Sequence, residues 1–294
     1  IEPVHIEFFS SLEAIAMAKA EIFQGLKSDG VAILNRDNKY FDLLAELAFK
    51  SGASKVVGFG IHEDADFRLI EIKTSSTNSI ITVSINGKKF DYELTIPGEY
   101  WAFNSLAILA AINYAGANLE LAADSLPNIK PLKGRGDTHI FSSIKGSIKL
   151  IDDSYNASPV SVSAAINLIK KTVVKENGRR IMVLGDMMEL GKNTKKYHLE
   201  LAPKIVEAKI DLVYVTGKNM EMMSKTLPDA VSVFVGKTSL QLIDPLLNTL
   251  HGNDLILIKG SAATSMSTVV DAIKDRLVIL SPKINTVKER LDAF

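Results

Sequence analysis

The sequence contains no cysteine among its 294 residues. Disulfide bridges, thiolate metal sites and a cysteine nucleophile are therefore excluded, and we expect a cytoplasmic protein because a reducing compartment does not support disulfides. No apolar run reaches the ~18 residues that a membrane-spanning helix needs. The composition therefore predicts no membrane insertion.

Net charge is also absent, because 34 lysine and arginine residues balance 34 aspartate and glutamate residues. Nucleic-acid-binding proteins usually carry a basic surface, so the balance argues against a nucleic-acid partner. Hydrophobic residues make up 47% of the chain, which is enough to form buried cores. At roughly 150 residues per domain, the length predicts two domains.

Three common motifs are missing. No G-x-G-x-x-G follows a predicted strand, no G-x-x-x-x-G-K-[ST] phosphate loop occurs, and there is no G-x-S-x-G nucleophile elbow. If the chain handles ATP, its phosphate-binding loop must therefore lie upstream of Ile1. The opening residues, IEPVHIEFF, resemble the end of a strand running into a loop, so we expect a fragment whose upstream part is absent.

The first part of the chain, residues 1–136, predicts a parallel α/β sheet with a small antiparallel unit. The antiparallel unit covers residues 65–95, where strand alternation surrounds an Asn86-Gly87 hairpin turn. The other elements expected here are helices at 11–26, 40–49, 100–115 and 119–126 and strands at 31–35 and 56–60.

The second part, residues 137–294, predicts a doubly wound, Rossmann-like α/β domain, because strands and helices alternate regularly. A Pro-, Gly- and charge-rich stretch at 127–137 marks the boundary. The expected strands are 138–144, 147–152, 180–186, 212–217, 232–236 and 255–260, and the expected helices are 159–175, 194–208, 219–226, 237–250 and 265–276. In such a sheet the carboxyl ends of the strands form a crevice where ligands bind.

The stretch LIDDSYNASP, residues 150–159, joins a predicted strand to a predicted helix. Asp152 and Asp153 follow the apolar strand, and Ser158-Pro159 is a strong helix-start signal. Carboxylates at a strand end can hold ribose hydroxyls or Mg²⁺, and a helix N-terminus favours an anion. A solvated turn with two capping aspartates is an equally good interpretation of these residues alone.

Basic side chains stand at further positions suited to phosphate. Lys19 lies among alanines in a predicted helix, either as a surface lysine with a buried stem or as a functional lysine beside a ligand. Arg135 stands between two glycines in the boundary, either as a linker residue or as a bidentate phosphate clamp. Lys259 ends a strand in Lys259-Gly260-Ser261, a pattern that can hold a carboxylate or a phosphate.

Other polar residues allow two interpretations each. Asp186 and Glu189 follow a strand in GDMMELG and can orient an amine or an ion. His198, on the next predicted helix, is more simply a surface histidine. Asn104 interrupts the apolar run of a predicted helix and is either a surface residue or one aimed at a ligand.

Several of these stretches occur in the order seen in Mur ligases, and the chain resembles that family over nearly its whole length. They are HIEFFSSLEAIAMAKAEIF, IPGEYWAFNSLAILAA, LKGRGD, LIDDSYNASP, IMVLGDMMELG and ILIKGSAATSM. DDSYNASP and GDMMELG point to the branch that adds D-alanyl-D-alanine. The resemblance implies that residues 1–136 are the latter part of the central ATP-binding domain and residues 137–294 the C-terminal domain.

The resemblance also implies a reaction, the ATP-dependent formation of an amide bond in peptidoglycan precursor synthesis. ATP phosphorylates a carboxylate of UDP-MurNAc-tripeptide, and the amine of D-alanyl-D-alanine attacks the acyl phosphate. Mg²⁺ and fixed cations stabilise the charge. We expect a monomer, and we expect this chain alone to be inactive because it has no phosphate loop.

The resemblance assigns roles to residues of this sequence. Lys19 matches a lysine that CO₂ carbamylates into a Mg²⁺ ligand, and His5 matches a histidine near the second Mg²⁺. Asn104 matches an adenine contact, Arg135 an arginine on the ATP phosphates and Asp153 an aspartate on the ribose. Lys19, His5 and Arg135 are thus the expected catalytic residues. The positions that face the amino-acid side of the cleft are Tyr155, Asn156, Lys259 and Ser261.

Two positions depart from the family pattern. Tyr100-Trp101 replace a His-Asn pair, which removes one adenine contact but leaves a ring that can stack. Ala262 replaces the arginine of K-G-S-R, a group that can bind a substrate carboxylate.

Two further functions stay open on the residues. One is another amino-acid-adding Mur ligase or a folylpolyglutamate synthetase, and the other is a nucleotide- or peptide-binding module without catalysis.

Overall fold

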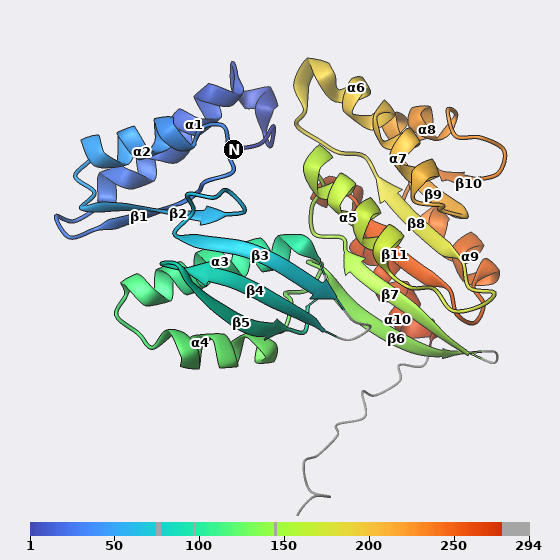
Figure 1. Ribbon diagram of the computed structural model, residues 1–294. Coiled ribbons are helices and arrows are strands. Elements are labelled where there is room, and N and C mark those ends of the chain that lie inside the picture. Colours follow the sequence, from blue (N-terminus) through green and yellow to red (C-terminus); the bar gives the residue numbers. More distant parts are fainter. Residues whose placement is uncertain (75–77, 97, 144–145, 278–294) are drawn as a thin grey trace, which may run out of the picture.

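The computed structural model describes residues 1–74, 78–96, 98–143 and 146–277, which form two β-sheets with helices on both faces (Figure 1). The tail of the second predicted domain, residues 278–294, lies outside the described residues. Within the described ranges, no helix combines the length and the apolar character that a membrane crossing requires.

The first sheet has the order β1-β2-β3-β4-β5. β1, β2 and β3 run parallel, whereas β3, β4 and β5 run antiparallel, as the sequence predicts. Its strands are Val31–Asn35 (β1), Lys55–Gly60 (β2), Phe67–Thr74 (β3), Ser79–Ile85 (β4) and Lys88–Leu94 (β5). The predicted hairpin turn joins β4 to β5, with φ of 49° at Asn86 and 82° at Gly87.

Helices cover both faces of this sheet and complete the first unit. They are α1 (Leu12–Ala20), α2 (Phe41–Lys50), α3 (Glu99–Tyr114) and α4 (Leu119–Ser125), with 3-10 turns η1 (Ile6–Phe8), η2 (Glu21–Gly25) and η3 (Leu126–Asn128). Ala32 and Leu34 of β1 pack with α1 and α2, whereas Val31 and Ile33 face the core formed by α3 and α4. The alternation of side chains along β1 therefore separates two cores.

The prediction that the chain opens with the end of a strand is wrong. Residues 1–2 have no regular structure, residues 3–5 form bends and Ile6–Phe8 forms a 3-10 turn. His5 has a φ of 59°, in the left-handed region, which interrupts an extended backbone.

The second sheet has the order β10-β9-β8-β11-β7-β6. Its strands are Asp137–Ser143 (β6), Gly146–Asp153 (β7), Arg180–Gly185 (β8), Leu212–Thr216 (β9), Ser232–Gly236 (β10) and Leu255–Lys259 (β11). All neighbours are parallel except β6 and β7, which are antiparallel. Parallel neighbours need a crossover of a dozen residues, which the short step from β6 to β7 does not provide.

Two layers of helices sandwich this sheet and complete the second unit. They are α5 (Pro159–Lys171), α6 (Thr194–Leu199), α7 (Leu201–Glu207), α8 (Lys218–Ser224), α9 (Leu240–Thr249) and α10 (Ser267–Arg276), with 3-10 turns η4 (Gly191–Asn193) and η5 (Ala262–Thr264). Leu257 of β11 packs with α5 and α7, whereas its neighbours Ile256 and Ile258 pack with α9 and α10. This is the predicted doubly wound arrangement.

The single helix predicted at 194–208 is wrong, because the chain breaks at Glu200 between α6 and α7. Pro203 lies in the first turn of α7. A continued α6 would need an N–H at this position and would place the proline ring against the carbonyl of Leu199.

Candidate functional site

A buried ion pair joins the carboxyl ends of two neighbouring strands. Asp153 ends β7 and Lys259 ends β11, and the two residues are partners in the strand register. The Lys259 Nζ donates to Asp153 Oδ2 over 2.6 Å and to the carbonyl oxygen of Asn156 over 3.0 Å. Lys259 is only 3% exposed. The carboxyl edge of the second sheet therefore carries a fixed, locally neutralised cation.

The charge state of Asp153 reflects several opposing effects. Burial is the largest and raises the pKa of its carboxyl above the usual range, while Lys259 and, more weakly, Arg135 lower it. The net direction is upward, so burial outweighs its cationic neighbours.

Residues 134–136 connect the two units and are called the hinge below. The hinge carries Arg135 and hydrogen bonds to residues at the end of β7. Gly136 N donates to the Asp152 carbonyl over 2.8 Å, and Tyr155 N donates to the Gly134 carbonyl over 3.0 Å. The Arg135 guanidinium carbon lies 4.0 Å from the centre of the Tyr155 ring. Arg135 is exposed but positioned by this ring, and its role as a phosphate clamp stays a prediction.

Tyr100, at the start of α3, belongs to the same junction. A Cβ at Gly136 would lie 2.6 Å from the Tyr100 hydroxyl, so the first unit meets the hinge here. Burial raises the Tyr100 pKa to about 12, and the negative charge of Asp153 adds to the effect. The sequence showed Tyr100 only as a departure from a pattern. Its position as the first residue of the helix predicted at 100–115 was the available signal.

The remaining residues predicted to face an amino-acid substrate are placed around this pair. Tyr155 is 55% exposed and Asn156 is exposed, so both present side chains to solvent. Ser261 is buried, and its hydroxyl has no hydrogen-bond partner among the described residues. Its backbone N–H donates to the Asp186 carbonyl over 3.2 Å. This hydroxyl is therefore an uncommitted donor and acceptor, two residues beyond the end of β11.

Three other predicted site residues lie apart from the ion pair. Lys19 is exposed in the last turn of α1, and Asn104 is exposed in the first half of α3. His5 hydrogen bonds through Nδ1 to the carboxylate of Glu189, from the second unit. Among the described residues, the two units therefore meet at the N-terminal segment as well as at the hinge.

The family resemblance assigns Mg²⁺ to His5 and Lys19, and this assignment stays a prediction. His5 Nε2 is unused by the bond to Glu189, and Lys19 would supply oxygen only as a carbamate. Among the described residues, no three His, Cys, Asp or Glu side chains cluster as a ready metal site. Mg²⁺ is commonly held by one or two protein groups together with substrate phosphates, so this sparse set is compatible with it.

Two sequence-based interpretations of the stretch after β8 are wrong. His198 is fully buried rather than on the surface, and its Nε2 accepts from Met187 N over 3.0 Å. Asp186 does not point at a substrate, because its carboxylate caps α8 by accepting from the backbone N–H groups of Asn219 and Met220. Both residues fix the local backbone.

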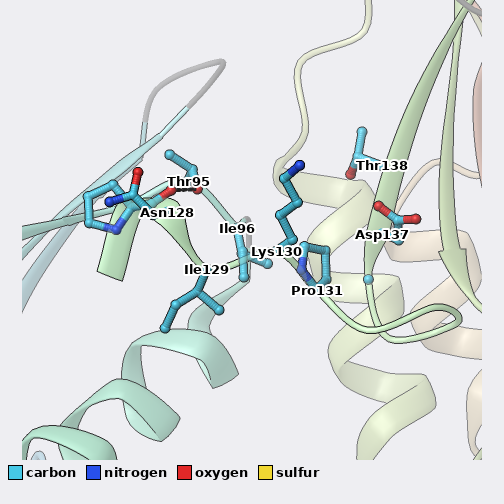
Figure 2. Close-up of a pocket in the computed structure, with 10 residues that line it drawn as sticks. Thr95, Ile96, Asn128, Ile129, Lys130, Pro131, Asp137 and Thr138 are labelled. Carbon is cyan, nitrogen blue, oxygen red and sulfur yellow. Dashed lines mark hydrogen bonds between the residues drawn. The ribbon is translucent and has the colours of Figure 1, made fainter. Parts of the chain in front are cut away.

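A pocket of about 370 Å³ opens beside the hinge (Figure 2). Its lining comes from both units and comprises Thr95, Ile96, residues 127–131, Gly136, Asp137 and Thr138. The Thr95 hydroxyl, directly after β5, donates to the Pro127 carbonyl of η3 over 2.8 Å. Neither Arg135 nor Asp153 lines this pocket, so it adjoins the ion pair without containing it.

Two family models match the chain, the Mur ligase middle domain at residues 1–112 and the Mur ligase, glutamate ligase domain at residues 138–262. The chain belongs to the Mur ligase family. Within this Mur ligase chain, the Arg135 hinge lies between the two matches, and both Asp153 and Lys259 lie inside the second. The resemblance inferred from the motifs is confirmed.

Curated relatives match this Mur ligase chain along most of its length. It is 32% identical over 271 residues to the UDP-N-acetylmuramoyl-tripeptide--D-alanyl-D-alanine ligase of Rickettsia prowazekii (strain Madrid E), covering 92% of this chain and 59% of the relative. It is 33% identical over 275 residues to the enzyme of that name from Escherichia coli (strain K12), covering 92% and 58%. The chain thus spans less than two thirds of the length of these relatives.

Solved Mur ligase structures share the fold. The chain superposes on MurF from Acinetobacter baumannii with a TM-score of 0.78 at 24% identity, covering 94% of this chain and 58% of that one. It superposes on the MurF ligase from Thermotoga maritima in complex with ADP with a TM-score of 0.77 at 22% identity, covering 94% and 60%. The predicted α/β architecture is confirmed.

Proposed function

We propose that this Mur ligase chain is the nucleotide- and amine-binding part of an enzyme that adds D-alanyl-D-alanine to UDP-MurNAc-tripeptide. The names of the relatives at 32% and 33% identity support this substrate pair. The observation that carries the proposal is the junction itself, where Arg135, Asp153 and Lys259 meet Tyr100 of the first unit. We assign residues 1–136 to the central domain and 137–294 to the C-terminal domain of a cytoplasmic, monomeric enzyme.

The nucleotide is proposed to lie between the two units at the hinge. Arg135 would bind phosphate oxygens, Asp153 would accept from a ribose hydroxyl, and Asn104 would contact adenine from α3. Arg135 is already oriented by the Tyr155 ring, so little side-chain entropy is lost when it binds phosphate. Tyr100 offers an aromatic face for the base in place of the missing His-Asn pair.

The proposed reaction has two steps. A substrate carboxylate oxygen bonds to the γ-phosphorus of ATP while the bond to ADP breaks. The amine nitrogen of the dipeptide then bonds to the acyl carbon and releases a proton, and phosphate leaves with the oxygen that joined it to that carbon. Arg135 would stabilise charge on the phosphoryl oxygens, and Tyr155, Asn156, Lys259 and Ser261 would orient the dipeptide.

Mg²⁺ would be held in part by His5 and by Lys19 as its carbamate, and when bound it would neutralise phosphate charge.

Because Lys259 already pairs with Asp153 and Ala262 replaces an arginine, we propose that the dipeptide carboxylate relies on hydroxyl and amide donors such as Ser261 and Asn156.

Calorimetric binding of ADP to the 294-residue chain tests the nucleotide site. We expect Arg135→Ala and Asp153→Ala each to weaken ADP about tenfold or more, because each removes a hydrogen bond that involves a charged group. Arg276→Ala, in an exposed ion pair on α10, is the control and should leave affinity unchanged. Unaltered affinity in both hinge variants would refute the placement of the nucleotide.

Product analysis tests the substrate. We propose that these 294 residues release no phosphate alone, because they contain no phosphate loop. The same residues joined to the upstream part expected for the family should form product with D-alanyl-D-alanine. Preference for a single amino acid would instead support another amino-acid-adding ligase, and binding without any product would support a non-catalytic module.

A further inference from the structure

The second meeting point of the two units lies at the N-terminal segment, near α6 in Figure 1. The His5 ring bonds through Nδ1 to the Glu189 carboxylate. The Glu7 N–H donates to the Glu189 carbonyl over 3.1 Å. A Cβ at Gly191 would lie 3.5 Å from the Cα of Glu7, so the backbones also touch. Glu189 therefore engages the first unit through both its side chain and its main chain.

Glu189 is presented by a firmly anchored loop. Met187 and Leu190 on either side are 0% and 2% exposed and belong to the core of the second unit. Met187 N also donates to the buried His198. The position of the Glu189 carboxylate is therefore set by the second unit.

His5 lacks comparable support from its own unit. The η1 turn that follows it contains no buried residue, and the His5 side chain is about half exposed. Within the described ranges, Glu189 is the one hydrogen-bond partner of the His5 ring. His5 and Glu189 have φ values of 59° and 61°, a costly region for residues other than glycine that persists where contacts over-determine it.

We propose that Glu189 is a positioning residue for His5 and that it acts across the two units. The proposal rests on the role proposed above for His5 at Mg²⁺. By accepting the Nδ1 proton, Glu189 keeps the lone pair on Nε2, which is the nitrogen left for a metal. Because Glu189 belongs to the second unit, His5 takes this tautomer and orientation only when the units are together. Closure of the units and readiness of the metal site are thereby coupled.

The tautomer of His5 can be measured directly. Long-range ¹H–¹⁵N spectra of the 294-residue chain, recorded near pH 8 where an ordinary histidine is neutral, distinguish Nδ1–H from Nε2–H. The chain has five histidines, and the His5→Gln spectrum assigns the His5 signals. We expect Nδ1–H in the unaltered chain, loss of that preference in Glu189→Ala, and partial retention in Glu189→Gln, whose amide oxygen still accepts.

The coupling to closure is tested by measuring the distance between two spin labels, one on each unit. The labels are attached to cysteines that replace the exposed residues Lys50 and Lys195, and the chain has no other cysteine. Glu189→Ala should broaden the distance distribution toward longer values, whereas Glu200→Gln, an equal charge change at an exposed site of the second unit, should not. The proposal is overturned if Glu189→Ala leaves both the His5 tautomer and the distances unchanged. Neither readout uses ATP or ligase activity, so absence of ligase activity would overturn the proposed function separately.

Discussion

Lys259 and Asp153 depend on each other for charge compensation in a buried site. Lys259 is 3% exposed, and the Asp153 side chain is 20% exposed. We expect Lys259→Met to lower the free energy of unfolding by about 3 kcal/mol, because Asp153 would be left without its cation. Urea denaturation of the variant and of Lys237→Met, an exposed lysine control, measures this. Equal midpoints for the two variants would show that the pair is unimportant for folding.

His198 predicts a pH dependence of stability. Burial lowers its pKa below the usual 6.5, and its neutral Nε2 accepts from Met187 N. At pH values between the lowered pKa of folded His198 and about 6.5, this histidine is protonated in the unfolded chain but not in the folded one. The free energy of unfolding therefore falls as the pH decreases through this window, and the contribution of His198 is fully present above it. Denaturation at about pH 7.5 and 5.5 should show a smaller loss in His198→Leu than in the unaltered chain. His62→Ala, at an exposed site, should keep the full loss.

The position of a single residue could be predicted where a motif fixes the backbone. It could not be predicted where burial in the folded chain determines whether a side chain is exposed. Asp153 and Lys259 end apolar strands of one sheet, whose carboxyl ends were expected to line a crevice, but the sequence did not show that these two strands are neighbours. His198 was misjudged, because its helix is short and one buried polar side chain leaves no periodic signature. The bond between His5 and Glu189 joins positions 184 residues apart and depends on how the units meet, which no local pattern contains.

At the scale of the element, the hinge depends on glycine. Gly134 has a φ of 76°, and a Cβ there would lie 3.0 Å from the backbone nitrogen of Tyr155. We expect Gly134→Ala to cost about 1–3 kcal/mol and to weaken ADP binding, because the hinge must shift away from Tyr155. Gly25→Ala is the matched control, since a Cβ there meets no atom within 4 Å. Urea denaturation and calorimetry of both variants provide the measurement, and equal behaviour would contradict the account of the hinge.

The order and type of most elements follow from periodicity, since buried strands and amphipathic helices alternate along the chain. The split between α6 and α7 was missed because Pro203 lies only a few residues inside an otherwise continuous helical pattern. The antiparallel pairing of β6 depends on the short step to β7, a topological constraint that strand patterns alone do not express.

At the scale of the whole molecule, the units are joined largely by exposed polar contacts in addition to the hinge. Lys171 of α5 pairs with Glu99 of α3, and both side chains are more than half exposed. Lys133 of the linker pairs with Asp271 of α10 over 3.1 Å, also at the surface. Each such exposed ion pair contributes little free energy to the association of the units, and its contribution falls as salt screens the charges. The relative position of the units should therefore respond to ionic strength, as domain contacts of this polar kind commonly allow.

Small-angle X-ray scattering tests this expectation. Raising ionic strength from about 0.05 to 0.5 M shortens the screening length from roughly 14 to 4 Å, so the radius of gyration should increase. Lys171→Glu should give the larger radius already at low salt, because it sets two negative charges against each other. The double variant Lys171→Glu with Glu99→Lys restores opposite charges and should return the low-salt radius toward the original. A single radius shared by all variants and salt concentrations would mean that the hinge and the contact of Glu189 with His5 hold the units together without these pairs.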